Sequence, residues 1–480
     1  MSPTQKGGTL AIEKNKGEVT MSKNMVEESE LKREIGVFGG MSIIAGIMIG
    51  AGVFYIGSYV LMRVEMNIGL ALLCWVIGGL ISLMGGLCFA ELGAMMPKAG
   101  GSIVYLNDAY HPILGFMSGF SSCFIAGPGS IAGLAIAMVT TMRTFFVIGD
   151  TTLKILAVGI IALLTIYNCY GVKKSSTLQN ISMIAKLIPI FLIMIAALFM
   201  GDIFPDMSFS HVSESAEAAG KSVISMIALA VVATLWAYEG WQNLNTLAEE
   251  IKEPQKNLPL AILLGVSGVM VLYLFFNFSI FRVIPLEEIK VMIANGDYYL
   301  GTEVAKRMFG NAGAVIVVIG MVLAIFGSLN GLILAGPRAW YALAKEGHFF
   351  KTFMYVHPVY KVPTHAIIAQ GVISCILVVA RSLDQLAILV VFTGMIFKML
   401  TIVTVIIFRK KYPNMDRPYK VIAYPVTVIL TILVFFGLII NNLIKDPSNS
   451  LLSCAAQIVA VAFYMYFDRK LKKEKAETIE

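Results

Sequence analysis

The stretch Gly46-Ile47-Met48-Ile49-Gly50-Ala51-Gly52-Val53-Phe54 lies inside the first long apolar segment of a chain of 480 residues. Glycines weaken a helix, because glycine loses more backbone freedom on folding than any other residue. One interpretation is a packing contact, since Gly46 and Gly50 have the GxxxG spacing of closely packed membrane helices. The other is an interruption at Gly50-Ala51-Gly52, whose unpaired N–H groups would attract a carboxylate. We favour the second interpretation, which predicts a binding site within an apolar helix.

The whole chain is unusually apolar. Hydrophobic residues make up 58% and charged residues 14%, with a mean hydropathy of +0.80, and a water-soluble surface cannot be built from that composition. Segments long enough to cross about 30 Å of hydrocarbon recur along the chain. Twelve are predicted, at residues 35–61, 68–95, 113–142, 153–172, 178–200, 222–245, 259–283, 312–344, 364–381, 384–408, 421–443 and 448–467. Because helices satisfy their own backbone hydrogen bonds in lipid, we expect an all-α integral membrane protein with twelve transmembrane helices.

Lysine and arginine gather in the tails and in alternate loops, which predicts that both termini are cytoplasmic. The predicted parts are a disordered cytoplasmic N-terminal tail (1–34), a core of ten helices (35–408), a basic cytoplasmic loop (409–420), two further helices (421–467) and a cytoplasmic C-terminal tail (468–480). The segment Phe408-Arg409-Lys410-Lys411 is predicted to be a cytoplasmic anchor beside anionic lipid, with a partner-binding patch as the alternative.

Other classes of protein find little support. The five histidines are scattered, and all six cysteines fall in predicted apolar spans, so we expect no metal site, no cofactor and no disulfide framework. No nucleophile and base stand in a pattern typical of an enzyme. The formal net charge of +7 is concentrated on the predicted cytoplasmic side, which favours the lipid bilayer as a partner over nucleic acid.

A second interrupted helix is expected five helices after the first in a transporter built from inverted repeats. The sixth apolar span contains Leu235-Trp236-Ala237-Tyr238-Glu239-Gly240-Trp241, with a glycine, flanking aromatic residues and a lone carboxylate. Unwound carbonyl groups at this point would bind a substrate ammonium group. The two interruptions together predict a site for a zwitterion.

Four ordered motifs resemble those of a known family. They are Ile49-Gly50-Ala51-Gly52-Val53-Phe54; Ala90-Glu91-Leu92-Gly93 with Pro97-Lys98-Ala99-Gly100-Gly101; Glu249-Glu250-Ile251-Lys252-Glu253-Pro254 with Asn257-Leu258-Pro259; and Phe326-Gly327-Ser328-Leu329-Asn330-Gly331. From about Leu31 to Arg409 the chain resembles the amino acid, polyamine and organocation (APC) transporter superfamily, and within it the L-type amino acid transporters. That group includes bacterial serine/threonine exchangers and the light chains of heteromeric amino acid transporters.

The resemblance implies a five-plus-five inverted repeat, the LeuT-like fold, with two extra C-terminal helices and with helices 1 and 6 unwound. It implies a sodium-independent secondary amino acid transporter that works by alternating access, an exchanger of neutral L-amino acids, with cationic ones left open. The loop at residues 141–152 contains no cysteine, whereas light chains use one there to attach a glycoprotein heavy chain. The resemblance therefore implies amino acids as substrates and no disulfide-linked heavy chain. Together with the polar N-terminal tail, it implies a multi-pass carrier of the cell (cytoplasmic) membrane.

The resemblance also implies which residues bind substrate. Those in the first interruption hold the carboxylate, and those in the sixth helix hold the ammonium group and the side chain, with Trp236 closing the site from outside. The predicted substrate-binding residues are Met48, Gly50, Ala51, Gly52, Trp236, Ala237, Tyr238 and Glu239. The family commonly has serine at the position of Ala51, so here the backbone N–H groups would carry more of the carboxylate binding.

Three of the charged residues within predicted membrane spans need separate interpretation. We expect Lys186 to face the bundle interior, with snorkelling to the interface as the alternative; the resemblance places its ammonium group where sodium-coupled relatives bind sodium. Lys398 is expected to snorkel or to form an internal ion pair. Glu239 has three interpretations: a partner for a cationic substrate side chain, a group that takes part in proton coupling, or a member of a structural pair.

Two rival functions stay open. One is a proton-coupled amino acid or polyamine importer of the same fold. The other is a membrane-embedded amino acid sensor, which would normally carry a large cytoplasmic signalling domain. The tails predicted here are short, at residues 1–34 and 468–480, and this favours the transporter.

Overall fold

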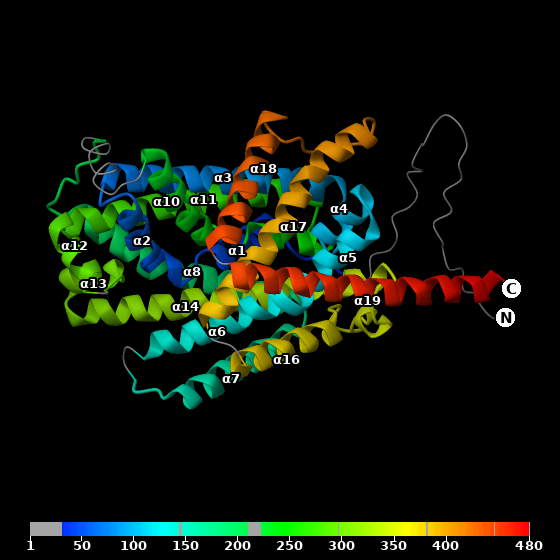
Figure 1. Cartoon of the computed structure of the whole chain (residues 1–480). Coiled ribbons are helices and arrows are strands. Elements are labelled where there is room, and N and C mark those ends of the chain that lie inside the picture. The colour runs from blue at the N-terminus through cyan, green and yellow to red at the C-terminus, as the bar shows by residue number, and fades with distance from the viewer. Residues whose placement is uncertain are drawn as a thin grey trace. The chain divides into compact units, whose positions relative to one another are not determined.

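The computed structural model describes residues 31–143, 146–209, 222–295, 297–380, 383–445 and 447–479, and Figure 1 shows their arrangement. Most of the predicted N-terminal tail therefore lies outside the described residues. The helical elements in chain order are α1 (Val37–Met48), η1 (Ala51–Phe54), α2 (Ile56–Arg63), α3 (Ile68–Met95), α4 (Ser102–Ala109), α5 (Pro112–Ser121), η2 (Ser122–Ala126), α6 (Gly127–Met142), α7 (Asp150–Asn168), α8 (Val172–Met200), α10 (Val223–Ala237), η3 (Trp241–Glu250), α11 (Pro254–Val283), α12 (Leu286–Ala294), α13 (Leu300–Phe309), α14 (Asn311–Ala335), α15 (Pro337–Lys345), η4 (Lys351–Met354), α16 (Thr364–Ala380), α17 (Leu383–Lys411), α18 (Val426–Lys445) and α19 (Pro447–Ile479).

The prediction of an all-α chain is confirmed, since the described residues form helices and no strand. Within the described ranges, eight helices are long and apolar enough to cross a membrane, and three more are apolar but shorter, at Val37–Met48, Thr364–Ala380 and Val426–Asn441. Every predicted span overlaps a helix, and the last, α19, continues to Ile479 beyond the predicted apolar end at residue 467. The number of membrane crossings stays a prediction.

Local sequence explains where several helices begin. The Asn67 side chain accepts a hydrogen bond of 2.8 Å from the Leu70 N–H at the start of α3, and the Ser222 hydroxyl accepts one from the Ser225 N–H at the start of α10. Such N-caps satisfy backbone donors that have no partner inside the helix. Proline follows the cap in α11, where Pro254 lacks an N–H that would otherwise be unpaired.

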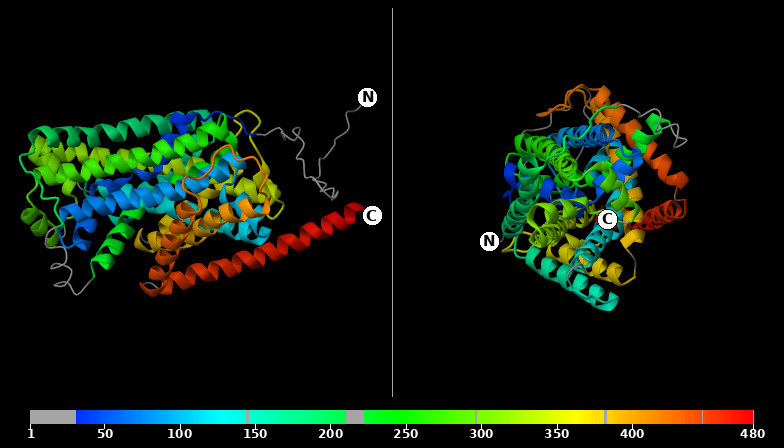
Figure 2. Two further views of the ribbon diagram at one scale, coloured as in Figure 1. Left: turned by 90° about the horizontal axis from the view of Figure 1, so that it is seen from above. Right: turned by 90° about the vertical axis from the view of Figure 1, so that its left-hand side faces the viewer.

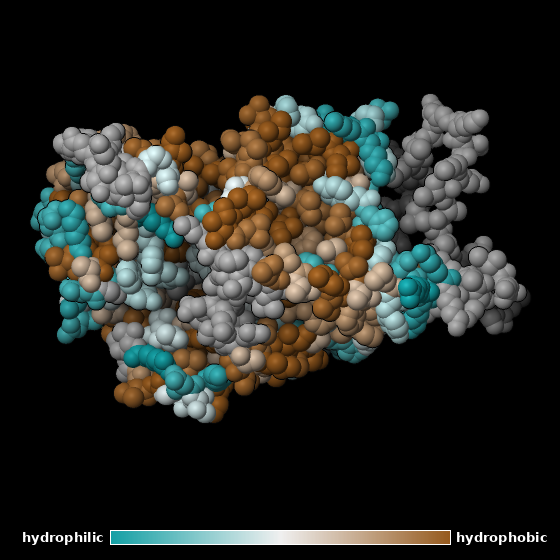
Figure 3. All heavy atoms as spheres, in the orientation of Figure 1, coloured by the Kyte–Doolittle hydropathy of each residue, from teal (hydrophilic) through white to brown (hydrophobic). Residues whose placement is uncertain are grey.

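The helices pack as a bundle in which most of the long elements run roughly parallel (Figure 2). The interrupted helix α1 lies in the interior, in contact with α8, α11 and α14, and α3 packs along α11. On the face shown in Figure 3, apolar residues cover the middle and hydrophilic residues gather toward both ends. Large apolar side chains such as Leu163 of α7 and Ile188 of α8 are exposed. A continuous apolar surface of this kind suits contact with lipid.

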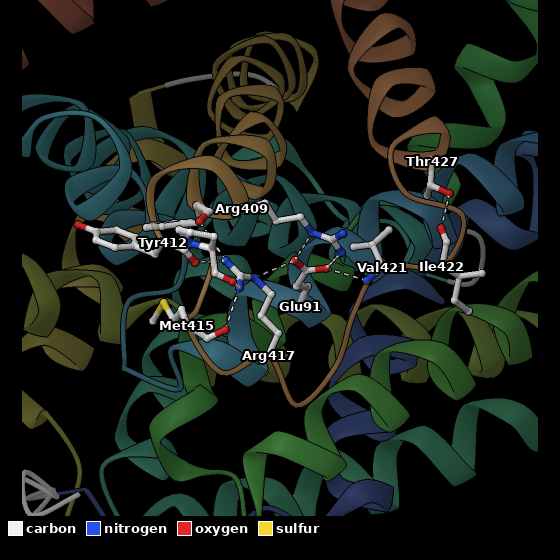
Figure 4. Close-up of polar contacts among 10 residues, drawn as sticks. Glu91, Arg409, Tyr412, Met415, Arg417, Val421, Ile422 and Thr427 are labelled. Atoms are coloured by element: carbon white, nitrogen blue, oxygen red, sulfur yellow. Dashed lines mark hydrogen bonds and ion pairs between the residues drawn. The ribbon is translucent and has the colours of Figure 1, made fainter. Parts of the chain in front are cut away.

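The segment between α17 and α18 is tied to α3 by a buried carboxylate (Figure 4). Arg409 donates to both Glu91 oxygens, Nε to Oε1 at 2.9 Å and Nη2 to Oε2 at 2.6 Å, and the Val421 N–H donates to Oε2 at 2.7 Å. Arg417 lies nearby, with its Nε 3.8 Å from Oε1. A buried carboxylate on α3 therefore holds the Arg409 guanidinium, and the contact of Phe408-Arg409-Lys410-Lys411 with anionic lipid stays a prediction. The neighbouring Lys410 is exposed.

Candidate functional site

The first interruption begins where α1 ends, at Met48. Ile49 has φ −79° and ψ 84°, and Gly50 has φ −102° and ψ −160°, so neither residue is helical. The chain resumes as a short 3₁₀ helix, η1, before α2 starts at Ile56. The first N–H groups of any helix lack intrahelical partners, and in η1 these groups belong to Ala51 and Gly52.

The second interruption lies between α10, which ends at Ala237, and η3, which starts at Trp241. Gly240 has φ +133°, a conformation that side chains rarely adopt. A Cβ atom at Gly240 would also lie 2.6 Å from Ile47 Cγ2. Both the backbone conformation and the lack of space therefore require glycine at position 240. The short distance to Ile47 also shows that the two interruptions are in contact.

A tyrosine hydroxyl joins the two interrupted helices. The Tyr273 hydroxyl, on α11, lies 2.8 Å from the Met48 carbonyl oxygen and 3.1 Å from the Ala237 carbonyl oxygen. Because the hydroxyl has one proton, it donates to one carbonyl at a time or is shared between them. Both carbonyls belong to the C-terminal end of a half-helix, where partial negative charge gathers.

Lys186 of α8 is fully buried and points at the end of α1. Its ammonium nitrogen donates hydrogen bonds of 2.6 Å to the carbonyl oxygens of Gly46 and Ile49. The Ser328 hydroxyl of α14 also lies 2.9 Å from the Gly46 oxygen. The expectation that Lys186 faces the bundle interior is confirmed, and the snorkelling alternative is wrong, because exposed carbonyls at the break attract the ammonium group.

Glu239 lies within the second interruption and faces α17. Its Oε1 accepts hydrogen bonds from Lys398 Nζ and, at 2.6 Å, from Gln242 Nε2. The Lys398 side chain is 9% exposed and that of Glu239 is 43% exposed. The expected alternative of an internal ion pair for Lys398 is confirmed, with Glu239 as its partner.

Tyr238 and Trp236 point to different places. The Tyr238 ring is buried against Trp75 and Tyr273, and its hydroxyl donates a 3.0 Å hydrogen bond to the Trp75 carbonyl oxygen. Only its backbone is therefore at the break. Trp236 is partly exposed and borders a cavity of about 250 Å³, whose lining residues are Tyr55, Ile56, Tyr59, Arg63, Val232, Ala233 and Trp236.

The structure thus brings most predicted site residues to one place. Met48 carries one of the bridged carbonyls, Gly50 approaches Ser328 of α14, and Glu239 lies two residues beyond the other bridged carbonyl. Tyr273 was not predicted, since a tyrosine in an apolar span resembles any core residue. Ser328 lies in one of the four motifs that carry the family resemblance, but no role was predicted for it.

Comparison with known proteins gives this geometry a context. A model of the amino acid permease family matches residues 35–463. The chain belongs to this family. The resemblance to the APC superfamily is therefore confirmed, and an amino acid permease with several long apolar helices is a multi-pass membrane protein.

Three relatives align along nearly the whole permease. The serine/threonine exchanger SteT of Bacillus subtilis (strain 168) is 32% identical over 94% of this chain and 99% of its own length. The human b(0,+)-type amino acid transporter 1 is 30% identical over 96% of this chain and 93% of its own length. The human cystine/glutamate transporter is 28% identical over 92% and 86%, respectively. All three are named as exchangers or transporters, and none as an enzyme.

Proposed function

We propose that this permease exchanges amino acids across the cell membrane by alternating access around the two interruptions. The observation that carries the proposal is the contact between them: Gly240 lies against Ile47, and the Tyr273 hydroxyl reaches a carbonyl of each half-helix. A site at that contact offers N–H groups and carbonyls side by side, which is what a zwitterion requires. Exchange is supported by the printed name of SteT, a serine/threonine exchanger.

The N–H groups at the start of η1, on Ala51 and Gly52, would bind the substrate carboxylate. The ammonium group would bind at the carbonyl end of α10, beside Ala237 and Tyr238. These roles follow from the charges at helix ends, which are positive at an N-terminus and negative at a C-terminus. Trp236 would close over the substrate from the outer side.

Sodium would not take part. The ammonium group of Lys186 already holds the Gly46 and Ile49 carbonyl oxygens, both at 2.6 Å. A sodium ion bound to these carbonyls would compete with a fixed cation. This contact supports sodium-independent transport.

The wider topology is part of the same proposal. It comprises twelve transmembrane helices in a five-plus-five inverted repeat with two extra helices, helices 1 and 6 unwound, and both termini in the cytoplasm. The loop at residues 141–152 has no cysteine, which supports a carrier that works without a disulfide-linked heavy chain. Residues 144 and 145 of that loop lie outside the described residues.

Purified protein in liposomes tests the function. Vesicles preloaded with labelled L-serine, in sodium-free buffer, should release the label when unlabelled amino acids are added outside, and should retain it in buffer alone. Adding sodium should change neither rate. Release that needs a pH gradient but no external amino acid would indicate proton-coupled transport instead of exchange. If no external amino acid caused release, the proposal would be overturned.

A further inference from the structure

The ion pair between Glu239 and Lys398 joins two distant parts of the chain at the proposed site. Glu239 lies in the break between α10 and η3, and Lys398 lies on α17. Lys398 is 9% exposed, so its ammonium group has little access to water and depends on this partner. Glu239 is 43% exposed, so a ligand at the break can reach its carboxylate.

The carboxylate is only partly occupied. Lys398 and Gln242 both donate to Oε1, and within the described part of the chain no donor reaches Oε2. Gln242 uses its amide nitrogen in this contact, and its amide oxygen is buried without a partner among the described residues. The Glu239 side chain is 43% exposed, so its carboxylate is the member of the pair that a substrate side chain would meet.

We infer that Lys398 is a tethered cation that neutralises Glu239, so that the site selects amino acids with uncharged side chains. The inference rests on the proposed function. A cationic side chain entering the site would compete with Lys398 for one carboxylate, and the displaced ammonium group would lose its partner in a poorly hydrated place. An anionic side chain would meet Glu239 as a like charge. Neutral side chains leave the pair intact.

The two members of the pair should therefore determine selectivity in opposite directions. Removing the charge of Lys398 frees Glu239 to hold a cationic side chain. Removing the charge of Glu239 frees Lys398 to hold an anionic side chain. A pair that only stabilised the fold would produce neither change, because both variants would lose the same contact.

The experiment compares Lys398→Gln, Glu239→Gln and the double variant in liposomes preloaded with labelled L-serine. The external probes are unlabelled serine, arginine and glutamate. The matched controls are Lys154→Gln on α7 and Glu287→Gln on α12, because both side chains are exposed and lie on other elements. Thermal unfolding in detergent shows whether each variant is folded.

In the wild type, serine should drive release while arginine and glutamate do little. Lys398→Gln should raise the ratio of arginine-driven to serine-driven release about tenfold, and Glu239→Gln should raise the glutamate ratio about tenfold. The double variant and both controls should keep the wild-type preference. If Lys398→Gln does not fold, Lys398→Met tests the same expected rise in arginine-driven release.

Wild-type exchange of arginine as fast as serine would overturn the inference, and so would unchanged ratios in folded Lys398 and Glu239 variants. Either result leaves amino acid exchange itself standing. Failure of the wild type to exchange any amino acid would instead overturn the proposed function.

Discussion

Glu91 and Glu239 are two carboxylates of the helical bundle that both pair with cations, in opposite surroundings. The Glu91 side chain is 2% exposed and receives two hydrogen bonds from Arg409 and one from the Val421 N–H, with Arg417 close by. The Glu239 side chain is 43% exposed and receives Lys398 and Gln242 on one oxygen. Both oxygens of Glu91 therefore accept hydrogen bonds, whereas only Oε1 of Glu239 does so among the described residues.

This difference indicates two different roles for an ion pair between helices. Arginine binds a carboxylate with two parallel hydrogen bonds in a fixed geometry, whereas lysine is a point charge on a flexible stem. The Arg409–Glu91 pair therefore suits a fixed connection between α3 and the end of α17. The Lys398–Glu239 pair suits a contact that a substrate can alter. Of the four predictions below, the first and the last test this division, and the other two test the proposed site.

The largest effect is expected for Arg409→Gln. Breaking a buried ion pair costs about 3–5 kcal/mol, and Arg417, with its Nε 3.8 Å from Glu91, replaces only part of the lost interaction. The variant should unfold at a clearly lower temperature than the wild type when heated in detergent. The matched control is Lys410→Gln, which removes the same charge from an adjacent exposed residue. An equal fall in unfolding temperature in both variants would mean that the contact with Glu91 does not cause the loss of stability.

Lys186→Met should have the next largest effect. It removes the ammonium donor from the Gly46 and Ile49 carbonyl oxygens, and an unsatisfied buried acceptor costs about 1–3 kcal/mol. Gly46 keeps the Ser328 hydroxyl, so Ile49 bears most of the loss. Exchange should fall about tenfold, since a 1.4 kcal/mol change is tenfold, and sodium should not restore it. Normal exchange in this variant would show that Lys186 serves only the fold.

The sequence predicts what local chemistry determines. The apolar spans predict the helices. Gly50 and Gly240 mark the ends of α1 and α10, where the two predicted interruptions lie. Lys186 could be placed in the interior because lipid excludes an unpaired charge.

Partners brought together by folding could not be predicted. Arg409 and Glu91 are 318 residues apart, and nothing near Arg409 distinguishes it from the lysines that follow. Lys398 and Glu239 are 159 residues apart, so an internal ion pair could be expected for Lys398 but its partner could not. Such pairs depend on helix packing rather than on sequence spacing.

A smaller effect is expected for Tyr273→Phe, which removes the hydroxyl between the Met48 and Ala237 carbonyl oxygens. The Gly50 N–H also donates to Met48, at 2.9 Å, so one acceptor keeps a partner. The loss should be about 1 kcal/mol in unfolding free energy. Serine-driven exchange should slow several-fold in the same vesicles. A variant that is less stable but exchanges at the wild-type rate would separate the hydroxyl from the proposed site.

Glu239→Gln should have the smallest effect on stability, although it changes selectivity. Glutamine keeps an oxygen that can accept from Lys398 and Gln242, and the Glu239 side chain is 43% exposed, so the loss should be under about 1 kcal/mol. Its unfolding temperature should stay close to that of Glu287→Gln, the exposed control. If Glu239→Gln instead unfolded as early as Arg409→Gln, the two carboxylates would be equivalent, and the Lys398–Glu239 pair would be a structural connection rather than a determinant of the substrate.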